Sequence, residues 1–365
     1  ELILACEWGP IKVFRREQGK WTEKTKALGL DSYTGCWNGV ATGDFDGDGR
    51  MDIVASNWGR NTKYQSHRGQ PLKIYYGPWR GEGSIDCMEA YYSASLNKVV
   101  PWPSYAVSKA LPWVGERFPT ADSFGKAGVE DILADQMKST KSLQATWLET
   151  TVFLNRGDHF EPKVLPMEAQ LSPAFGVSVG DFDGDGNEDI FLAQNFFAFD
   201  GDTGRCDAGR GLWLAGDGKG NFRSIPGQAS GVKVYGEQRG CALSDYDGDG
   251  RVDLVVSQNG AETKLYHNDT ARPGLRIRLN GPPGNPDGIG AVVRLGAANK
   301  LGPAREIHAG SGYWSLESAV QVMSLPEAPS SVSVKWPGGK NTSSKIPPNA
   351  REISINPAGE LKVLH

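Results

Sequence analysis

Short stretches in which hydrophobic and polar residues alternate cover most of the chain, and three of them have the same surroundings. Each leads into an acidic run through small and β-branched residues, and each is followed by a β-branched run. The stretches before the acidic runs are "WNGVATG" (37–43), "FGVSVG" (175–180) and "GCALS" (240–244). The runs after them are "DIVASN" (52–57), "DIFLAQN" (189–195) and "DLVVSQN" (253–259). This pattern predicts short antiparallel strands joined by tight turns.

The acidic runs themselves are near copies of one another. They read "GDFDGDGRMD" (43–52), "GDFDGDGNED" (180–189) and "SDYDGDGRVD" (244–253). Similar units that recur at intervals of tens of residues are typical of arrays and propellers. We therefore expect an all-β fold made of β-propeller blades, which form an incomplete ring in this chain.

Two segments depart from the repeat. Residues 72–92 keep the strand–turn–strand outline but only one aspartate, Asp86, and Trp79 stands where the acidic run would open. We interpret this segment as a degenerate copy. Residues 95–148 instead have helical spacing, with Ser104 and Thr120 as candidate helix caps. We predict a mostly helical insertion there.

The two ends of the sequence also differ from the repeat. The first residues look like the later strands of a blade, so we expect the chain to begin inside a blade whose opening strand lies upstream. The last part has no acidic run and alternates strand patterns with Gly/Pro turns. We therefore predict propeller blades over residues 1–272 and a small β domain over 273–365.

Composition narrows the functional classes. The chain has 365 residues and 39% hydrophobic residues, enough for a substantial core, and its net charge of −4 comes without any Lys/Arg block. Nucleic-acid binding therefore has no electrostatic support. No apolar run is long enough to span a membrane. The five cysteines form no CxxC pair; we expect most to be buried small hydrophobes, and one disulfide stays possible.

The acidic runs carry the chemistry. Counted from the first aspartate, positions 1, 3, 5 and 9 are Asp and position 6 is Gly, which allows a tight turn. Hard oxygen ligands at alternate positions favour Ca²⁺, with the backbone carbonyl of position 7 as a further ligand. Position 12, where an EF-hand has Glu, is apolar here, so position 9 should close the site. The predicted ligands of about three structural Ca²⁺ ions are Asp44, Asp46, Asp48, Arg50 and Asp52; Asp181, Asp183, Asp185, Asn187 and Asp189; and Asp245, Asp247, Asp249, Arg251 and Asp253.

Other interpretations of the same residues are weaker. A solvated acidic turn would not explain three copies with identical ligand positions. A catalytic role is disfavoured because no partner group recurs beside the carboxylates. Ser178 matches a G-x-S-x-G pattern, but it lies in a predicted strand that runs into an acidic loop rather than at a strand–helix elbow.

The chain resembles two families. Residues 1–272 resemble FG-GAP/VCBS repeats, the calcium-loop blades of integrin-alpha-like β-propellers, through "CEWGPIKVF", "WNGVATGDFDGDG", "NWGRNTKY", "ERFPTADSF", "LPMEAQLSPAFGVSVGDFDGDGNEDI" and "GRCDAGRGLWLAGDGKGNF". The tail resembles an ASPIC/UnbV domain through "NPDGIGAVVRL", "GSGYWS" and "VSVKWPGGK", although "QVMSLP" replaces that family's His-Phe-Gly-Leu-Gly stretch. The domain order is similar to that of bacterial cartilage-acidic-protein-like proteins. The resemblance implies calcium-binding propeller loops and a secreted, periplasmic or cell-surface location, and it implies no enzyme activity.

Two functional hypotheses follow. The first is an extracytoplasmic calcium-binding module that binds or scaffolds macromolecules, with a protein partner or upstream blades completing the propeller. The alternative is a polysaccharide-active lyase or hydrolase, or a glycan-binding module. Its candidate acids are Glu116, Glu130 and Asp131, for which the sequence shows no pairing. The tryptophans at positions 37, 58, 79, 102 and 113 could stack on sugars or anchor a protein partner, but packing between blades is the favoured explanation.

Overall fold

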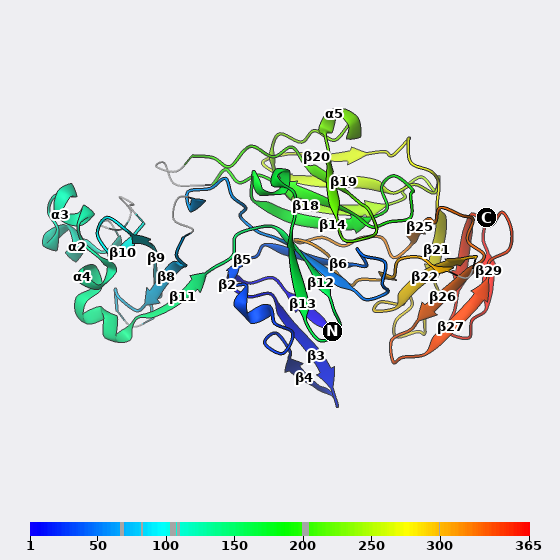
Figure 1. The fold of residues 1–365 in the computed structure, drawn as a ribbon, viewed down its shortest axis with the longest axis horizontal. Helices are drawn as coiled ribbons and strands as arrows, with labels where there is room; N and C mark the ends of the chain where they lie inside the picture. Colours follow the sequence, from blue (N-terminus) through cyan, green and yellow to red (C-terminus); the bar gives the residue numbers. More distant parts are fainter. Residues whose placement is uncertain (66–68, 82, 103–106, 108–109, 199–203, 299) are drawn as a thin grey trace.

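The chain folds into many small sheets, most of them antiparallel (Figure 1). The computed structural model describes residues 1–365 apart from 66–68, 82, 103–106, 108–109, 199–203 and 299. Strands account for 41% of the chain and helices for 10%, and no closed sheet is found in the described part. The all-β class expected from the sequence is therefore confirmed.

Each acidic run joins the first two strands of a sheet. The first sheet has the order β13-β12-β7-β6 and consists of β6 (Gly39–Gly43), β7 (Asp52–Ser56), β12 (Thr151–Asn155) and β13 (Phe160–Val164). The second follows the order β14-β15-β16-β17, with β14 (Ala174–Gly180), β15 (Asp189–Gln194), β16 (Leu212–Gly216) and β17 (Phe222–Ile225). The third consists of β18 (Glu237–Ser244), β19 (Asp253–Asn259) and β20 (Ala261–Tyr266).

The first strands of these three sheets pack against one another, which explains their small residues. A Cβ atom on Gly39 would lie 2.4 Å from the backbone oxygen of Phe175, and one on Gly176 would lie 2.6 Å from that of Arg239. These glycines therefore let β6, β14 and β18 approach closely. Hydrophobic residues then fill the space between neighbouring sheets, with Val54, Val177 and similar side chains between the first two.

A separate unit is inserted between β7 and β12 and lies at one end of the molecule (Figure 1). Its sheet has the order β10-β9-β8-β11, formed by β8 (Leu72–Gly77), β9 (Asp86–Ser93), β10 (Lys98–Pro101) and β11 (Lys141–Ala145). Its helices in the described residues include α2 (Pro112–Arg117), α3 (Ala121–Gly125), α4 (Val129–Leu133) and η3 (Ala134–Ser139). The predicted helical segment 95–148 thus contains these helices, but β10 and β11 tie them to the strands of the preceding segment.

This insertion corrects the interpretation of residues 72–92. They do not follow a finished blade, because the blade that opens at Gly39 is completed only by β12 and β13, beyond the insertion. Trp79 is 4% exposed and packs in the insertion's own core, where its indole nitrogen donates to Thr140. Thr120 caps α3 through Ser123 as expected, whereas Ser104 lies outside the described residues.

The N-terminal residues form two small sheets. One has the order β1-β3-β4, with β1 (Leu2–Leu4), β3 (Lys12–Glu17) and β4 (Lys20–Glu23); the other pairs β2 (Glu7–Gly9) with β5 (Gly35–Cys36). The short helix η1 (Leu30–Ser32) lies between β4 and β5. Ile11, Leu30 and Trp37 pack there against Phe153 of the first acidic-loop sheet.

The C-terminal residues form two sheets around a core of their own. One has the order β25-β21-β28-β29, with β21 (Leu275–Leu279), β25 (Gln321–Met323), β28 (Glu352–Ile355) and β29 (Leu361–Val363). The other contains β22 (Val292–Ala297), β23 (Lys300–Leu301), β24 (Arg305–Glu306), β26 (Ser331–Lys335) and β27 (Asn341–Lys345). Val293, Val332 and Ile353 are among the fully buried residues between them. The domain boundary at residue 272 stays a prediction.

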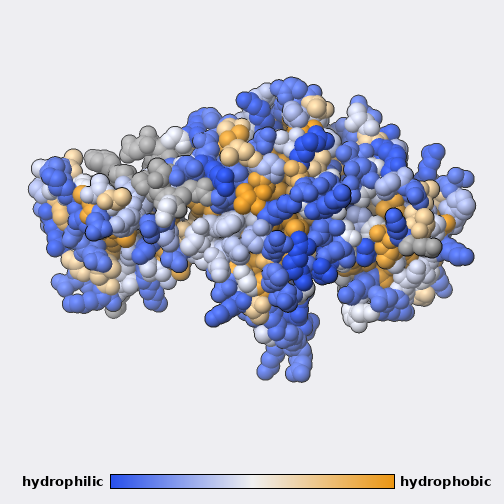
Figure 2. Space-filling view, in the orientation of Figure 1, coloured by the Kyte–Doolittle hydropathy of each residue, from blue (hydrophilic) through white to orange (hydrophobic). Residues whose placement is uncertain are grey.

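The surface is largely hydrophilic on the face drawn in Figure 2, where hydrophobic residues appear only in small areas between polar ones. Among the described residues, no helix is long and apolar enough to cross a membrane. The described residues also include a short helix, α5 (Gly227–Ser230), and a 3-10 helix, η4 (Met167–Gln170).

Candidate cation sites

The three acidic loops share one backbone geometry, which the sequence pattern dictates. In each, position 1 directly follows the innermost strand and position 9 opens the next strand, as Asp44 and Asp52 do around the first loop. The glycines at positions 4 and 6 have positive φ angles in all three loops. At Gly49 (φ +88°) a side chain would also collide with the guanidinium group of Arg294. The positive φ angle is the reason that glycine is favoured there, because the guanidinium group lies at the end of a flexible side chain that can move aside.

The position-9 aspartates fasten each loop to its sheet. Asp52 accepts the backbone N–H of Phe45 (2.9 Å) and that of Asn155 on β12 (2.7 Å). Asp189 and Asp253 make the equivalent pairs of bonds to the loop's position 2 and to the neighbouring strand or loop. Position 9 thus has a structural role in addition to the predicted ligand role, since its oxygens hold two segments of backbone together.

Carboxylate oxygens converge in every loop. In the first, Asp44, Asp46 and Asp48 each offer an oxygen within 4.8 Å of the others. The corresponding groups in the other two loops consist of positions 1, 3 and 9, namely Asp181, Asp183 and Asp189, and Asp245, Asp247 and Asp253. The structure therefore brings together at least three predicted ligands in each loop. These are positions 1, 3 and 5 in the first loop, but positions 1, 3 and 9 in the other two.

Unpartnered oxygens in the first loop fit a cation. Asp44 is fully buried, and its Oδ1 has no hydrogen-bond partner among the described residues; the same holds for the buried Oδ1 of Asp46. The other oxygen of each is satisfied, with Asp46 Oδ2 lying 2.6 Å from Arg156 Nη1. Buried oxygen atoms without a donor are costly, so two of them side by side favour a bound positive ion.

Burial also perturbs the ionisation of these aspartates. Desolvation raises the pKa of Asp52 to about 7 and that of Asp181 to about 6, and it raises the pKa of Asp189 well above its ordinary value. Neighbouring carboxylates raise these values further, while hydrogen bonds from backbone N–H groups oppose the shift. The protein alone thus compensates these negative charges only in part.

Positions 5 and 7 interact through side chains as well as backbone. Asp48 accepts the backbone N–H of Arg50 and also forms an ion pair with its guanidinium group. Asp249 and Arg251 do the same in the third loop, and the amide of Asn187 bonds to Asp185 in the second. The sequence pattern predicts only a carbonyl role for position 7, and these side-chain pairs were not expected from it.

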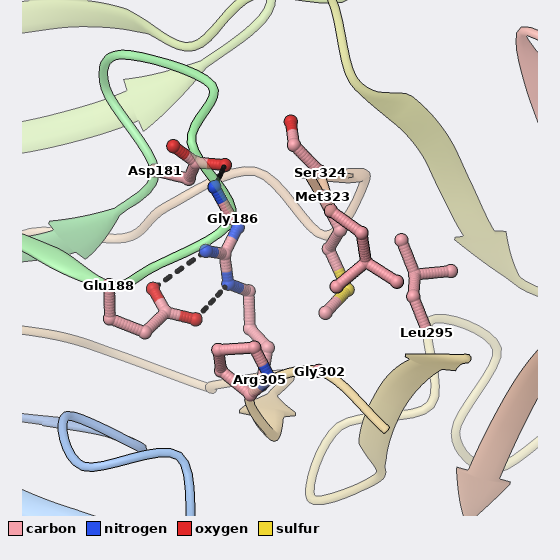
Figure 3. Close-up of a pocket in the computed structure, with 10 residues that line it drawn as sticks. Asp181, Gly186, Glu188, Leu295, Gly302, Arg305, Met323 and Ser324 are labelled. Atoms are coloured by element: carbon pink, nitrogen blue, oxygen red, sulfur yellow. Dashed lines mark hydrogen bonds and ion pairs between the residues drawn. The ribbon is translucent and has the colours of Figure 1, made fainter. Parts of the chain in front are cut away.

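The C-terminal domain contacts all three acidic loops. The backbone N–H of Ala304 donates to Asp44 Oδ2 at 2.8 Å, and Arg276 forms an ion pair with Asp245. Near the second loop, Arg305 donates to both oxygens of the buried Glu188, at 2.9 and 2.6 Å, close to Asp181 (Figure 3). These partners lie far away in the sequence, and no local pattern could have identified them.

The remaining candidate residues have structural surroundings. Ser178 is fully buried in β14 and donates to the backbone oxygen of Cys241, so it is not placed as a nucleophile. All five cysteines are free, and three are buried. Trp37 and Trp79 are buried, and the other three named tryptophans are partly buried, so packing explains these five residues.

The candidate acids of the alternative hypothesis lie on the helices of the insertion. Glu116, Glu130 and Asp131 are exposed. Asp131 accepts both the Lys98 ammonium group (2.9 Å) and the Gly128 backbone N–H (2.7 Å), and the Lys98 hydrogen bond holds its pKa below the ordinary value. These contacts explain Asp131 as the residue that fastens the start of α4.

Comparison with known families matches both ends of the chain. Residues 1–55 match the family model of an FG-GAP-like repeat, and this match includes the first acidic loop. Residues 281–361 match the family model named ASPIC and UnbV, which covers most of the C-terminal sheets. No curated protein matches the chain. These matches confirm the resemblance to an FG-GAP-like repeat over residues 1–55 and to an ASPIC/UnbV domain over residues 281–361.

Proposed function

We propose that this protein is an extracytoplasmic binding or scaffold module whose acidic loops hold structural Ca²⁺ ions. FG-GAP-like repeats and ASPIC/UnbV domains are typical of extracellular-type proteins, which supports the location and the general class of function. The propeller-like arrangement of the three loop-bearing sheets offers surfaces for a macromolecular partner, a protein first of all. Other blades of a propeller could also pack against these sheets.

One observation carries the calcium part of the proposal. In the first loop, Asp44 and Asp46 each keep a buried oxygen that accepts no hydrogen bond from the described residues, and the side-chain groups that converge there are carboxylates. An all-oxygen ligand set favours a hard cation, and a flexible loop of this kind favours Ca²⁺ over Mg²⁺. A bound ion would supply the positive charge that these carboxylates lack.

The chain's own residues then have distinct roles. Asp44 and Asp46 would contribute ligand oxygens, while Asp52 holds the loop to β12 through Asn155. Ala304 would keep Asp44 oriented from the C-terminal side. Because only the folded loop gathers these groups, cation binding would add to the free energy of unfolding.

Thermal unfolding in Ca²⁺ and in EDTA tests this proposal. We expect saturating Ca²⁺ to raise Tm by about 5 °C or more over EDTA, with a smaller effect of Mg²⁺. Asp46→Asn should reduce this rise. Asp158→Asn is the matched control, because Asp158 is an exposed carboxylate outside the acidic loops and its loss should leave the rise unchanged. A Tm that is the same in Ca²⁺ and EDTA would exclude the calcium sites.

The polysaccharide-active alternative has no specific observation in its favour. The five tryptophans that suggested it are wholly or partly packed inside the protein. Its candidate acids are exposed and belong to different helices, α2 and α4, and nothing in the described residues brings Glu116 together with Glu130 or Asp131.

A further inference from the structure

The first aspartates of the three loops, although equivalent in sequence, differ in how many hydrogen bonds they already accept. Asp44 accepts two, both at Oδ2, from Gly49 and Ala304. Asp181 accepts three, from the backbone of residues 184, 185 and 186. A carboxylate has about four acceptor positions. The first two loops therefore retain acceptor capacity for a cation.

Asp245 differs because all of its acceptor positions are in use. Oδ1 accepts the backbone N–H groups of Gly248 (2.8 Å) and Asp249 (3.1 Å). Oδ2 accepts that of Gly250 (2.8 Å) and a guanidinium N–H of Arg276. The Asp245 side chain is only 1% exposed, so this ion pair is shielded from water. The guanidinium group thus supplies the positive charge that a metal ion would otherwise supply at this position.

Arg276 also pairs with a second carboxylate, that of Glu352. It lies on β21, beside Glu352 of β28 in the parallel register of the C-terminal sheet. Its Nε lies 3.0 Å from Glu352 Oε2. Arg276 therefore bridges the acidic loop and the C-terminal domain, and it can release Asp245 while its charge remains paired.

The surroundings leave room for such a movement. Arg276 lines an open groove of about 790 Å³ between the third loop and the C-terminal domain. The same groove is lined by Asp249 and Arg251 of the loop, and by Leu325 and Arg351 of the C-terminal domain. Solvent, a hydrated cation and a displaced side chain can all be accommodated there.

We propose that Arg276 is an internal competitor for the cation at the third acidic loop, which accepts Ca²⁺ only by releasing its ion pair with the C-terminal domain. This inference rests on the proposed calcium function and refines it: the loops at Asp44 and Asp181 bind Ca²⁺ more tightly than the loop at Asp245. Rising Ca²⁺ then loosens the link between the third loop and β21 after the other two loops are loaded.

Calorimetric titration of the full chain with Ca²⁺ tests the competition. Arg276→Gln should tighten the weakest site by about tenfold to a hundredfold, the equivalent of one charge-assisted hydrogen bond. The matched control is Arg278→Gln, because Arg278 lies on the same strand and pairs with Glu352 but does not contact Asp245. It should change the affinity of the third site far less than Arg276→Gln does, because both Arg276 and Glu352 remain in place. The double variant Arg276→Gln/Asp245→Asn should lose the increase in Ca²⁺ affinity that Arg276→Gln alone produces.

A second variant guards against a folding defect and changes the affinity in the opposite direction. Glu352→Gln removes the carboxylate to which Arg276 retreats, so it should strengthen the pair with Asp245 and weaken the third site. Equal affinities for three ions in the wild type, or an Arg276→Gln titration identical to the wild type, would overturn the competition while leaving calcium binding intact. The absence of Ca²⁺ binding in the wild type and all variants would instead overturn both proposals.

Discussion

The first and third acidic loops have the same aspartates at the same positions, yet their surroundings make them different candidate sites. Asp44 accepts a backbone N–H from the C-terminal domain and lies within electrostatic reach of its Arg294, but one of its buried oxygens accepts no hydrogen bond from the described residues. Asp245 forms an ion pair with a guanidinium group from the same domain, and all four of its acceptor positions are occupied by hydrogen bonds. A motif therefore specifies which groups can bind a cation, whereas packing against a second domain decides whether they are available.

The largest expected effect concerns the second loop, where the C-terminal domain binds a neighbouring carboxylate rather than the first aspartate. Arg305 and Glu188 are 10% and 2% exposed. Arg305→Met should lower the free energy of unfolding by about 3–5 kcal/mol, because it leaves a buried carboxylate unpaired. Urea unfolding provides the measurement. Arg278→Met, at a half-exposed ion pair, should change it by about 1 kcal/mol or less.

If Arg305→Met proved as mild as Arg278→Met, the contact between the second loop and the C-terminal domain would contribute little to stability. The comparison among the three loops would then lose its structural basis.

The effect of Glu317 on the pH dependence of stability has to be distinguished from that of the loop carboxylates. Burial raises the pKa of Glu317 from its ordinary 4.5 to about 7. Its contribution to stability is therefore fully present below about pH 4.5 and is lost as the pH rises through about 7, because ionisation favours the unfolded chain. Glu317→Gln should remove about 3 kcal/mol of this pH dependence. Parallel profiles of the variant and the wild type over this range would contradict the expectation.

Single substitutions of the first aspartate allow a direct comparison of the first and third loops. Asp44→Asn should remove about 2–3 kcal/mol of the stabilisation gained on adding Ca²⁺, the amount expected for one well-saturated site. Asp245→Asn should remove much less, because Arg276 already occupies that aspartate. The quantity to compare is the difference in unfolding free energy between Ca²⁺ and EDTA for each variant. Equal losses would mean that the loops are equivalent.

The smallest effect is expected at position 7. The second loop has Asn187 there, which bonds to Asp185 at 3.0 Å, whereas the third loop has Arg251 in an ion pair with Asp249. Arg251→Asn should therefore be tolerated, with a change of about 1 kcal/mol or less in unfolding free energy. Thermal unfolding in EDTA measures this change. A much larger loss would show that the bond from Arg251 to the backbone oxygen of Ala271 matters more than the ion pair.

Much of the local structure could be predicted from the sequence because it depends on neighbouring residues. The alternating runs predict the strands on either side of each acidic loop, and the glycines predict its tight turn. Thr120 was predictable as a helix cap, since its partner Ser123 is three residues away. The order of strands in the first sheet was not predictable, because an insertion separates β7 from β12 and strand pairing does not depend on distance along the chain.

The sequence by itself determined the class of fold, the resemblance to two families and the carboxylates that could bind a cation. All of these follow from residue type and local spacing, which tertiary contacts do not alter. Only the tertiary structure decided that one oxygen of Asp44 accepts no hydrogen bond from the described residues, whereas Asp245 is paired with Arg276. The physical reason is that charge compensation depends on distance in space, and the compensating groups come from a domain far away in the sequence.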